Sequence, residues 1–200
     1  YGENGYGAIK GAKSRAVPGL EQYFHTNTFL SDALTLEADK EIEKAVAEKR
    51  PFYLNMAHYA VHSPFETDKR FIGHYTDPKK NQQACAFATL IEGMDKSLGD
   101  LMDKLEELGI AENTLIIFLG DNGGDAPLGG AADYGSSAPF KGKKGSEYEG
   151  GVRVPFIVAW AHPDEENKFQ KAFPVAQNAI QTQMGTVMDI YPTVLSVAGV

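Results

Sequence analysis

The stretch that decides the fold is NTLIIFLGDNGG, residues 113–124. Its five apolar residues in a row, 115–119, predict a buried strand. The strand then breaks into a glycine-rich loop that begins with Gly120, Asp121 and Asn122. Because ligands of open α/β sheets bind at the carboxyl ends of the strands, we interpret Asp121 and Asn122 as metal ligands at an active site.

A simple turn is the competing interpretation of the same residues, since Asn-Gly and Asp-x-Gly are strong turn signals that carry no chemistry. A carboxylate and an amide oxygen are hard ligands, which suit calcium or magnesium. An EF-hand loop does not fit, because Gly123 occupies its third position and no Glu occupies its twelfth.

The composition indicates a globular domain of 200 residues, with 42% hydrophobic and 10% aromatic residues. A net charge of −8 argues against nucleic acid as a partner, because phosphate binding requires a basic face. No apolar run approaches the roughly 20 residues of a membrane-spanning helix. The one cysteine, Cys85, excludes an internal disulfide and a cysteine-based zinc site, and its apolar surroundings predict a buried, inert thiol.

The hydrophobic pattern alternates between helices and strands. Apolar residues at helical spacing predict a helix from Ser31, capped by Ser31 or Asp32, that Pro51 stops. A longer amphipathic helix spans residues 87–108, with Gly109 after its end. Further elements are expected as strands at 52–57 and 156–160 and as a helix that begins near Asp189 and ends at Gly199. This order predicts an α/β fold with a mainly parallel sheet flanked by helices.

A second junction of a strand with a loop carries His58 and His62. Neutral imidazoles can bind metal, move protons or hydrogen-bond an oxyanion. His62 lies beyond the predicted strand, where a functional role competes with a histidine that caps a loop carbonyl. His58 lies close to the strand, and we interpret it as structural.

Residues 123–151 form a long loop, which in a compact domain is usually functional or disordered. Lys141, Lys143 and Lys144 lie in it between glycines and can close over an anion, although solvated surface lysines are the commoner outcome. Glu149 and Arg153 are expected to form a structural ion pair. The motifs of serine hydrolases, zincins, Walker A loops and dinucleotide-binding folds are absent from the sequence.

Taken together, these residues resemble the sulfatase family of the alkaline phosphatase-like superfamily. Three blocks carry the resemblance: PFYLNMAHYAVHSP at 51–64, NTLIIFLGDNGG at 113–124 and PFKGKKGSEYEGGVRVP at 139–155. The closing DIYPTVLSVAGV, residues 189–200, fits as well. Within the blocks, Gly120 stands where Ser is common, and Phe140 and Lys141 replace Leu and Arg.

The resemblance implies a sulfuric ester hydrolase of incomplete alkaline phosphatase-like fold, possessing a site for Ca²⁺ or Mg²⁺. Asp121 and Asn122 would be two of the metal ligands. His62 would contact the sulfate or help to protonate the leaving oxygen, and Lys144 would hold a sulfate oxygen. A cation, a lysine and a histidine aimed at these oxygens stabilise the negative charge that builds up as the ester breaks.

Two expected features of the family are absent from the chain. No Cys or Ser has the Cys/Ser-x-Pro/Ala-x-Arg context from which sulfatases make formylglycine, and the family's first metal ligands, an Asp-Asp pair, are not seen. We expect both on upstream sequence, so that residues 1–200 are a partial catalytic domain without its nucleophile segment and C-terminal subdomain and are inactive alone.

Two alternatives stay open from the sequence. The first is a phosphatase or phosphonate monoester hydrolase of the same superfamily, and the second is a catalytically inactive relative that binds glycans. The resemblance implies a sulfate ester substrate, small or glycan, and a periplasmic or secreted location.

Overall fold

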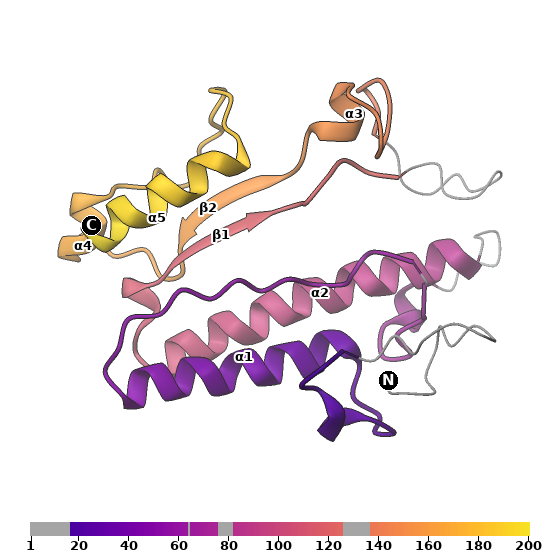
Figure 1. Cartoon of the computed structure of the whole chain (residues 1–200), viewed down its shortest axis with the longest axis horizontal. Coiled ribbons are helices and arrows are strands. Elements are labelled where there is room, and N and C mark those ends of the chain that lie inside the picture. Colours follow the sequence, from indigo (N-terminus) through magenta and orange to yellow (C-terminus); the bar gives the residue numbers. More distant parts are fainter. Residues whose placement is uncertain (1–16, 64, 76–81, 126–136) are drawn as a thin grey trace.

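In the computed structural model, the chain is described over residues 17–63, 65–75, 82–125 and 137–200. Two long helices form one layer, and a two-stranded sheet lies beside them (Figure 1). The helices and strands are α1 (Leu30–Ala47), α2 (Gln82–Glu107), β1 (Leu115–Leu119), α3 (Glu149–Val152), β2 (Phe156–Trp160), α4 (Lys168–Ala172) and α5 (Ile190–Ala198). Short 3₁₀ turns occur at Glu21–Tyr23, Ile72–Tyr75, Ala111–Asn113 and Val187–Asp189.

The predicted helices α1 and α2 are confirmed, but the predicted cap of α1 is wrong. Phe29 precedes the first turn in an extended conformation and makes no side-chain cap. Ser31 and Asp32 lie inside the helix, where the Asp32 carboxylate pairs with the Arg70 guanidinium at 2.8 Å. At the other end of the helix pair, Gly109 has a φ of +66° as it leaves α2, which explains the glycine there.

The apolar core lies where α1, α2 and the start of β1 meet. Ile42 of α1, Leu105 of α2 and Ala111 before β1 are buried together. Half-buried apolar residues pack around them: Leu101, Leu108, Ile110, Ile116 and Ala161. This cluster fixes the amino-terminal end of β1 against the helices, so its carboxyl-terminal end points away from the core.

The sheet corrects the prediction of a mainly parallel arrangement. In the described part of the chain it has two strands, which pair antiparallel with Leu115 opposite Trp160 and Leu119 opposite Phe156. Parallel pairing requires a crossover that carries the chain back to the starting end of the sheet. Here the chain instead returns at the end where β1 stops, and the observed pairing is therefore antiparallel. The α/β class is confirmed, because helices accompany the sheet.

The predicted strand at 52–57 is also wrong. This segment has no strand assignment, and no described residue shares a backbone hydrogen bond with it. A strand requires a neighbour that completes its ladder, and the described part of the chain supplies none. The side chains of Phe52, Tyr53 and Leu54 are exposed.

The last helix confirms its prediction with one change. Pro192 lies in the first turn of α5, and Gly199 ends the helix with a φ of +76°. The preceding turn is capped by Thr186, which exchanges hydrogen bonds with Asp189 in a capping box, so Asp189 contributes through its side chain to the turn before α5. Among the helices that the structure describes, none combines the length and apolar character needed to cross a membrane.

Candidate active site

The loop that follows β1 is bound through its backbone to the lysine loop. The Gly123 amide donates to the Gly151 carbonyl at 2.9 Å, and the Lys144 amide donates to the Gly124 carbonyl at 2.9 Å. These two bonds join segments that are distant in the sequence. They bring the loop of Asp121 and Asn122 and the loop of Lys144 to one place.

Glycines make this contact possible, because the backbones touch without room for side chains. A Cβ atom on Gly123 would lie 2.2 Å from the Gly150 carbonyl oxygen. One on Gly150 would lie 2.2 Å from the Gly142 oxygen, and one on Gly151 would lie 2.1 Å from the Ser146 oxygen. Gly123, Gly150 and Gly151 therefore serve close approach of backbone to backbone. The sequence pattern alone did not reveal this role, for which the Gly-Gly pairs at 123–124 and 150–151 were the available signal.

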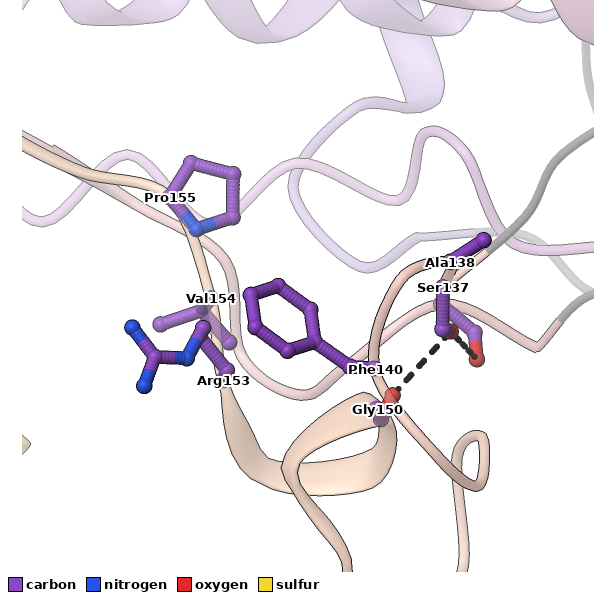
Figure 2. Close-up of a pocket in the computed structure, with 8 residues that line it drawn as sticks. Ser137, Ala138, Phe140, Gly150, Arg153, Val154 and Pro155 are labelled. Carbon is purple, nitrogen blue, oxygen red and sulfur yellow. Dashed lines mark hydrogen bonds between the residues drawn. The ribbon is translucent and has the colours of Figure 1, made fainter.

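Side chains around α3 hold the returning loop. The Ser137 hydroxyl donates to the Gly150 carbonyl at 3.2 Å, as Figure 2 shows, beside an open pocket of about 320 Å³. The Arg153 guanidinium lies over the Phe140 ring, 4.8 Å from its centre. Arg153 also pairs with Glu149, which confirms the predicted ion pair. These contacts orient α3 and keep its glycines against the β1 loop.

The three lysines of the loop have different surroundings. The Lys143 ammonium pairs with the Asp125 carboxylate at 3.0 Å, and the Lys141 ammonium lies 4.0 Å from the centre of the Tyr148 ring. The Lys144 side chain is half-buried, and its ammonium has no ion pair with any residue that the structure describes. Lys144 is thus the lysine of this loop whose ammonium has neither an ion pair nor a ring contact among the described residues, which leaves it available to an anion.

The side chains of Asp121 and Asn122 fit a hard cation. The Asn122 Nδ2 atom donates to the Gly123 carbonyl at 2.9 Å, which leaves its Oδ1 atom for a ligand. Asp121 is exposed, and its carboxylate has no hydrogen bond or ion pair among the described residues. Two oxygen donors of this type suit Ca²⁺ or Mg²⁺. A cluster of three or more His, Cys, Asp or Glu side chains is not found within the described ranges.

His62 is held in one orientation by its own turn. Its amide donates to the Tyr59 carbonyl at 2.9 Å, and its Nδ1 atom lies 2.7 Å from the Ser63 carbonyl oxygen. Because a carbonyl only accepts, Nδ1 carries a hydrogen, and Nε2 is the nitrogen left for a ligand or a proton. The ring is exposed.

The structure joins Lys144 to the loop of Asp121 and Asn122, whereas no hydrogen bond or ion pair in the described part of the chain links His62 to them. Figure 1 shows the chain between α1 and α2 running along α2 toward the end of the molecule at which α3 lies. Pro64 of the second junction and residues 126–136 of the long loop lie outside the described residues. The common placement of His62 and Lys144 on one substrate stays a prediction.

Comparisons with a family model, with protein sequences and with solved structures all give the same family. The sulfatase family model matches residues 3–200. N-acetylgalactosamine-6-sulfatase of Canis lupus familiaris is 30% identical over 174 residues, 87% of this chain and 29% of that protein. Human steryl-sulfatase is 33% identical over 173 residues, 85% of this chain and 26% of that protein.

A solved structure extends the likeness to the fold. The crystal structure of Ps i-CgsB in complex with k-i-k-neocarrahexaose superposes with a TM-score of 0.72 at 31% identity, over 86% of this chain and 34% of that one. The fold is thus part of an alkaline phosphatase-like α/β fold, and the chain spans about a third or less of the proteins it matches. With a family model that covers nearly every residue, the chain belongs to the sulfatase family.

Proposed function

We propose that the full-length protein is a metal-dependent sulfatase, which hydrolyses sulfate esters. The observation that carries this proposal is the hydrogen bond of 2.9 Å from the Lys144 amide to the Gly124 carbonyl. It brings the backbone of Lys144, a residue with a cationic side chain, to a loop with two oxygen donors. A site of that kind binds a sulfate group between the lysine and a cation held by the loop.

Asp121 and Asn122 would hold the cation, with Ca²⁺ as the proposed ion and Mg²⁺ as the other ion that their oxygens suit. When bound, such an ion supplies Lewis-acid stabilisation of the charge on the sulfate oxygens. Lys144 binds one sulfate oxygen and orients the ester. His62 presents Nε2, the atom that takes up a proton and passes it to the leaving oxygen, while the Ser63 carbonyl holds Nδ1.

The nucleophile and the remaining metal ligands are proposed to lie on sequence outside residues 1–200. No residue here has the sequence context of a formylglycine precursor, and two donors are fewer than the roughly six to eight oxygens that Ca²⁺ takes. We therefore propose that residues 1–200 form part of one catalytic domain and have no turnover alone.

A sulfated glycan is the proposed substrate class. Its support comes from the names of similar proteins, which include an N-acetylgalactosamine-6-sulfatase and a protein in complex with a neocarrahexaose. A steryl-sulfatase is equally similar in sequence, so a small sulfate ester is the alternative that the assay includes.

The test is hydrolysis by the full-length protein of 4-nitrophenyl sulfate, 4-nitrophenyl phosphate and sulfated oligosaccharides, with released sulfate or phosphate measured by ion chromatography. We expect sulfate release that a chelator abolishes and Ca²⁺ restores. The Asp121→Ala variant should lose about 100-fold or more of kcat. Preferential phosphate release would identify the phosphatase alternative, and no hydrolysis with retained glycan binding would identify the inactive relative.

Asp125→Ala is the matched control, since Asp125 is an acidic residue of the same loop that pairs with Lys143. It should keep kcat within about threefold, as exposed ion pairs contribute little. Equal losses in the Asp121 and Asp125 variants would overturn the metal assignment.

A further inference from the structure

A buried chain of hydroxyl groups crosses the contact between α1 and α2. Thr35 of α1 and Ser97 of α2 are 3% and 1% exposed, and their hydroxyl oxygens lie 2.5 Å apart. The Thr35 hydroxyl also lies 2.8 Å from the Ser31 carbonyl. The predicted apolar stripes of the helices contain neither residue, and buried hydroxyls of this kind must find partners.

The directions of these hydrogen bonds follow from the carbonyl at one end. The Ser31 carbonyl only accepts, so the Thr35 hydroxyl hydrogen is used there. The Ser97 hydroxyl therefore donates to Thr35, and the lone pairs of its oxygen face the next partner. That partner is the His58 Nε2 atom at 3.4 Å, which must donate.

His58 is thus protonated at Nε2 and His62 at Nδ1. The His58 ring is half-buried, and burial lowers its pKa, so the neutral ring with a single hydrogen is the stable form. His58 directs its hydrogen into the helix pair, while His62 directs its hydrogen to its own loop and leaves Nε2 open.

The segment between the two histidines is short and forms a hydrogen-bonded turn. His58 immediately precedes the turn that the His62 amide closes on the Tyr59 carbonyl at 2.9 Å. The segment before it, 51–57, has no backbone hydrogen bond to described residues. The hydrogen bond between the His58 ring and Ser97 thus connects the start of this turn to α2.

We infer that His58 is a positioning residue for His62: its Nε2 hydrogen bond to Ser97 anchors the turn of residues 59–62 on α1 and α2 and so sets where the His62 ring lies. This inference rests on the proposed function for its kinetic consequence, while the anchoring itself is independent of any activity.

The test compares two variants of the full-length protein that differ in the length of the side chain at position 58. His58→Gln retains an N–H donor near the Nε2 position, whereas His58→Asn is too short to reach Ser97. We expect His58→Asn to lower kcat by about 10- to 100-fold with KM within about threefold, because a displaced proton donor harms the reaction more than binding. His58→Gln should restore kcat to within about threefold of the wild type.

Hydrogen–deuterium exchange of the peptide that contains residues 59–63 reads the anchoring without any substrate. The His62 amide should exchange faster in His58→Asn and in Ser97→Ala, and at the wild-type rate in His58→Gln. Thr35→Ser, which keeps the hydroxyl, and His74→Asn, which changes an exposed histidine paired with Glu92, are matched controls that should change neither readout. Thermal melts check that the variants are folded. If His58→Asn does not fold, Ser97→Ala replaces it in both measurements.

The inference is overturned if the His62 amide exchanges at the wild-type rate in His58→Asn, or if His58→Gln is impaired as strongly as His58→Asn. A wild-type protein that hydrolyses neither sulfate nor phosphate esters would refute the proposed function alone, because the exchange measurement would still decide the anchoring.

Discussion

Lys143 and Lys144 are neighbours in the sequence, yet their surroundings differ. The Lys143 ammonium is already paired with Asp125, at the exposed edge of the loop. The Lys144 amide is bound to the β1 loop, while its half-buried side chain has no ion-pair partner in the described ranges. A pair of adjacent lysines is thus divided into one that stabilises the loop and one that can bind an anion.

Lys144→Ala in the full-length protein should lower kcat/KM for a sulfate ester by about 100- to 1,000-fold, because a charge opposite the developing sulfate charge is lost. Lys143→Ala should change it by less than about fivefold, since an exposed ion pair is worth at most about 1 kcal/mol. Steady-state kinetics of both variants checks this, and similar losses would mean that the anion-binding lysine is misassigned.

The half-buried ring of His58 predicts a pH dependence of stability. Its pKa is lowered by burial, so the unfolded chain binds a proton that the folded chain does not. The free energy of unfolding should therefore rise with pH up to the ordinary histidine pKa of about 6.5 and lose this contribution as pH falls below it. The pKa of the exposed His162 is raised by its hydrogen bond to Glu106, so its contribution to the free energy of unfolding is lost as pH rises.

Urea denaturation of the wild type and of His58→Gln at about pH 7.5 and about pH 5.5 isolates this contribution. The wild type should lose more stability on acidification than the variant, in which residue 58 does not titrate. Equal losses would show that His58 is not held neutral by burial.

At the scale of elements, the glycines of α3 and of the β1 loop pack backbone against backbone. In Gly150→Ala, the new Cβ would lie 2.2 Å from the Gly142 oxygen and 2.8 Å from the Lys141 oxygen. We expect a loss of about 1–3 kcal/mol in the free energy of unfolding, because neither backbone oxygen can yield without moving the lysine loop. The same shift should lower kcat.

Gly99→Ala is the matched control, as Gly99 lies within α2 with no atom within 4 Å of its Cβ position. It should stabilise the protein by about 0.5–1 kcal/mol, the difference in helix propensity between the two residues, and leave kcat unchanged. Denaturation and kinetics of both variants check the pair, and a stable, fully active Gly150→Ala would contradict the backbone packing.

Periodicity predicted the long helices well, since apolar residues that repeat at helical spacing over several turns form one buried face only in a helix. Helix starts were predicted less well. Ser31 and Asp32 were expected as caps but lie inside α1, where Ser31 is buried and Asp32 pairs with Arg70. The prediction of a strand at 52–57 was wrong because strand formation depends on a neighbouring strand that local sequence does not reveal.

At the scale of the whole molecule, the chain spans 29% of the N-acetylgalactosamine-6-sulfatase that it matches. Several large apolar side chains are nearly fully exposed here, among them Ile180 at 93% and Met184 at 90%. The activity is accordingly a property proposed for the whole protein, and tests of function belong to the full-length chain.

Metal removal gives a test at this scale. A chelator should lower the melting temperature of the full-length protein, and Ca²⁺ should restore it, because an ion that binds the folded state alone stabilises by about 2.7 kcal/mol at roughly 100 times its Kd. Asp121→Ala should abolish the Ca²⁺-dependent shift and Asp125→Ala should retain it. Differential scanning fluorimetry measures these shifts, and a wild-type shift in Asp121→Ala would remove Asp121 from the metal site.

The sequence by itself determined the long helices α1 and α2, the strand β1 and the family, because these depend on local pattern and on ordered motifs. Only the tertiary structure decided that β1 and β2 pair antiparallel, that Lys144 lies against the β1 loop and that His58 reaches Ser97. These three facts depend on contacts between residues far apart in the chain. Their energy comes from packing and hydrogen-bond satisfaction in three dimensions, which no local pattern encodes.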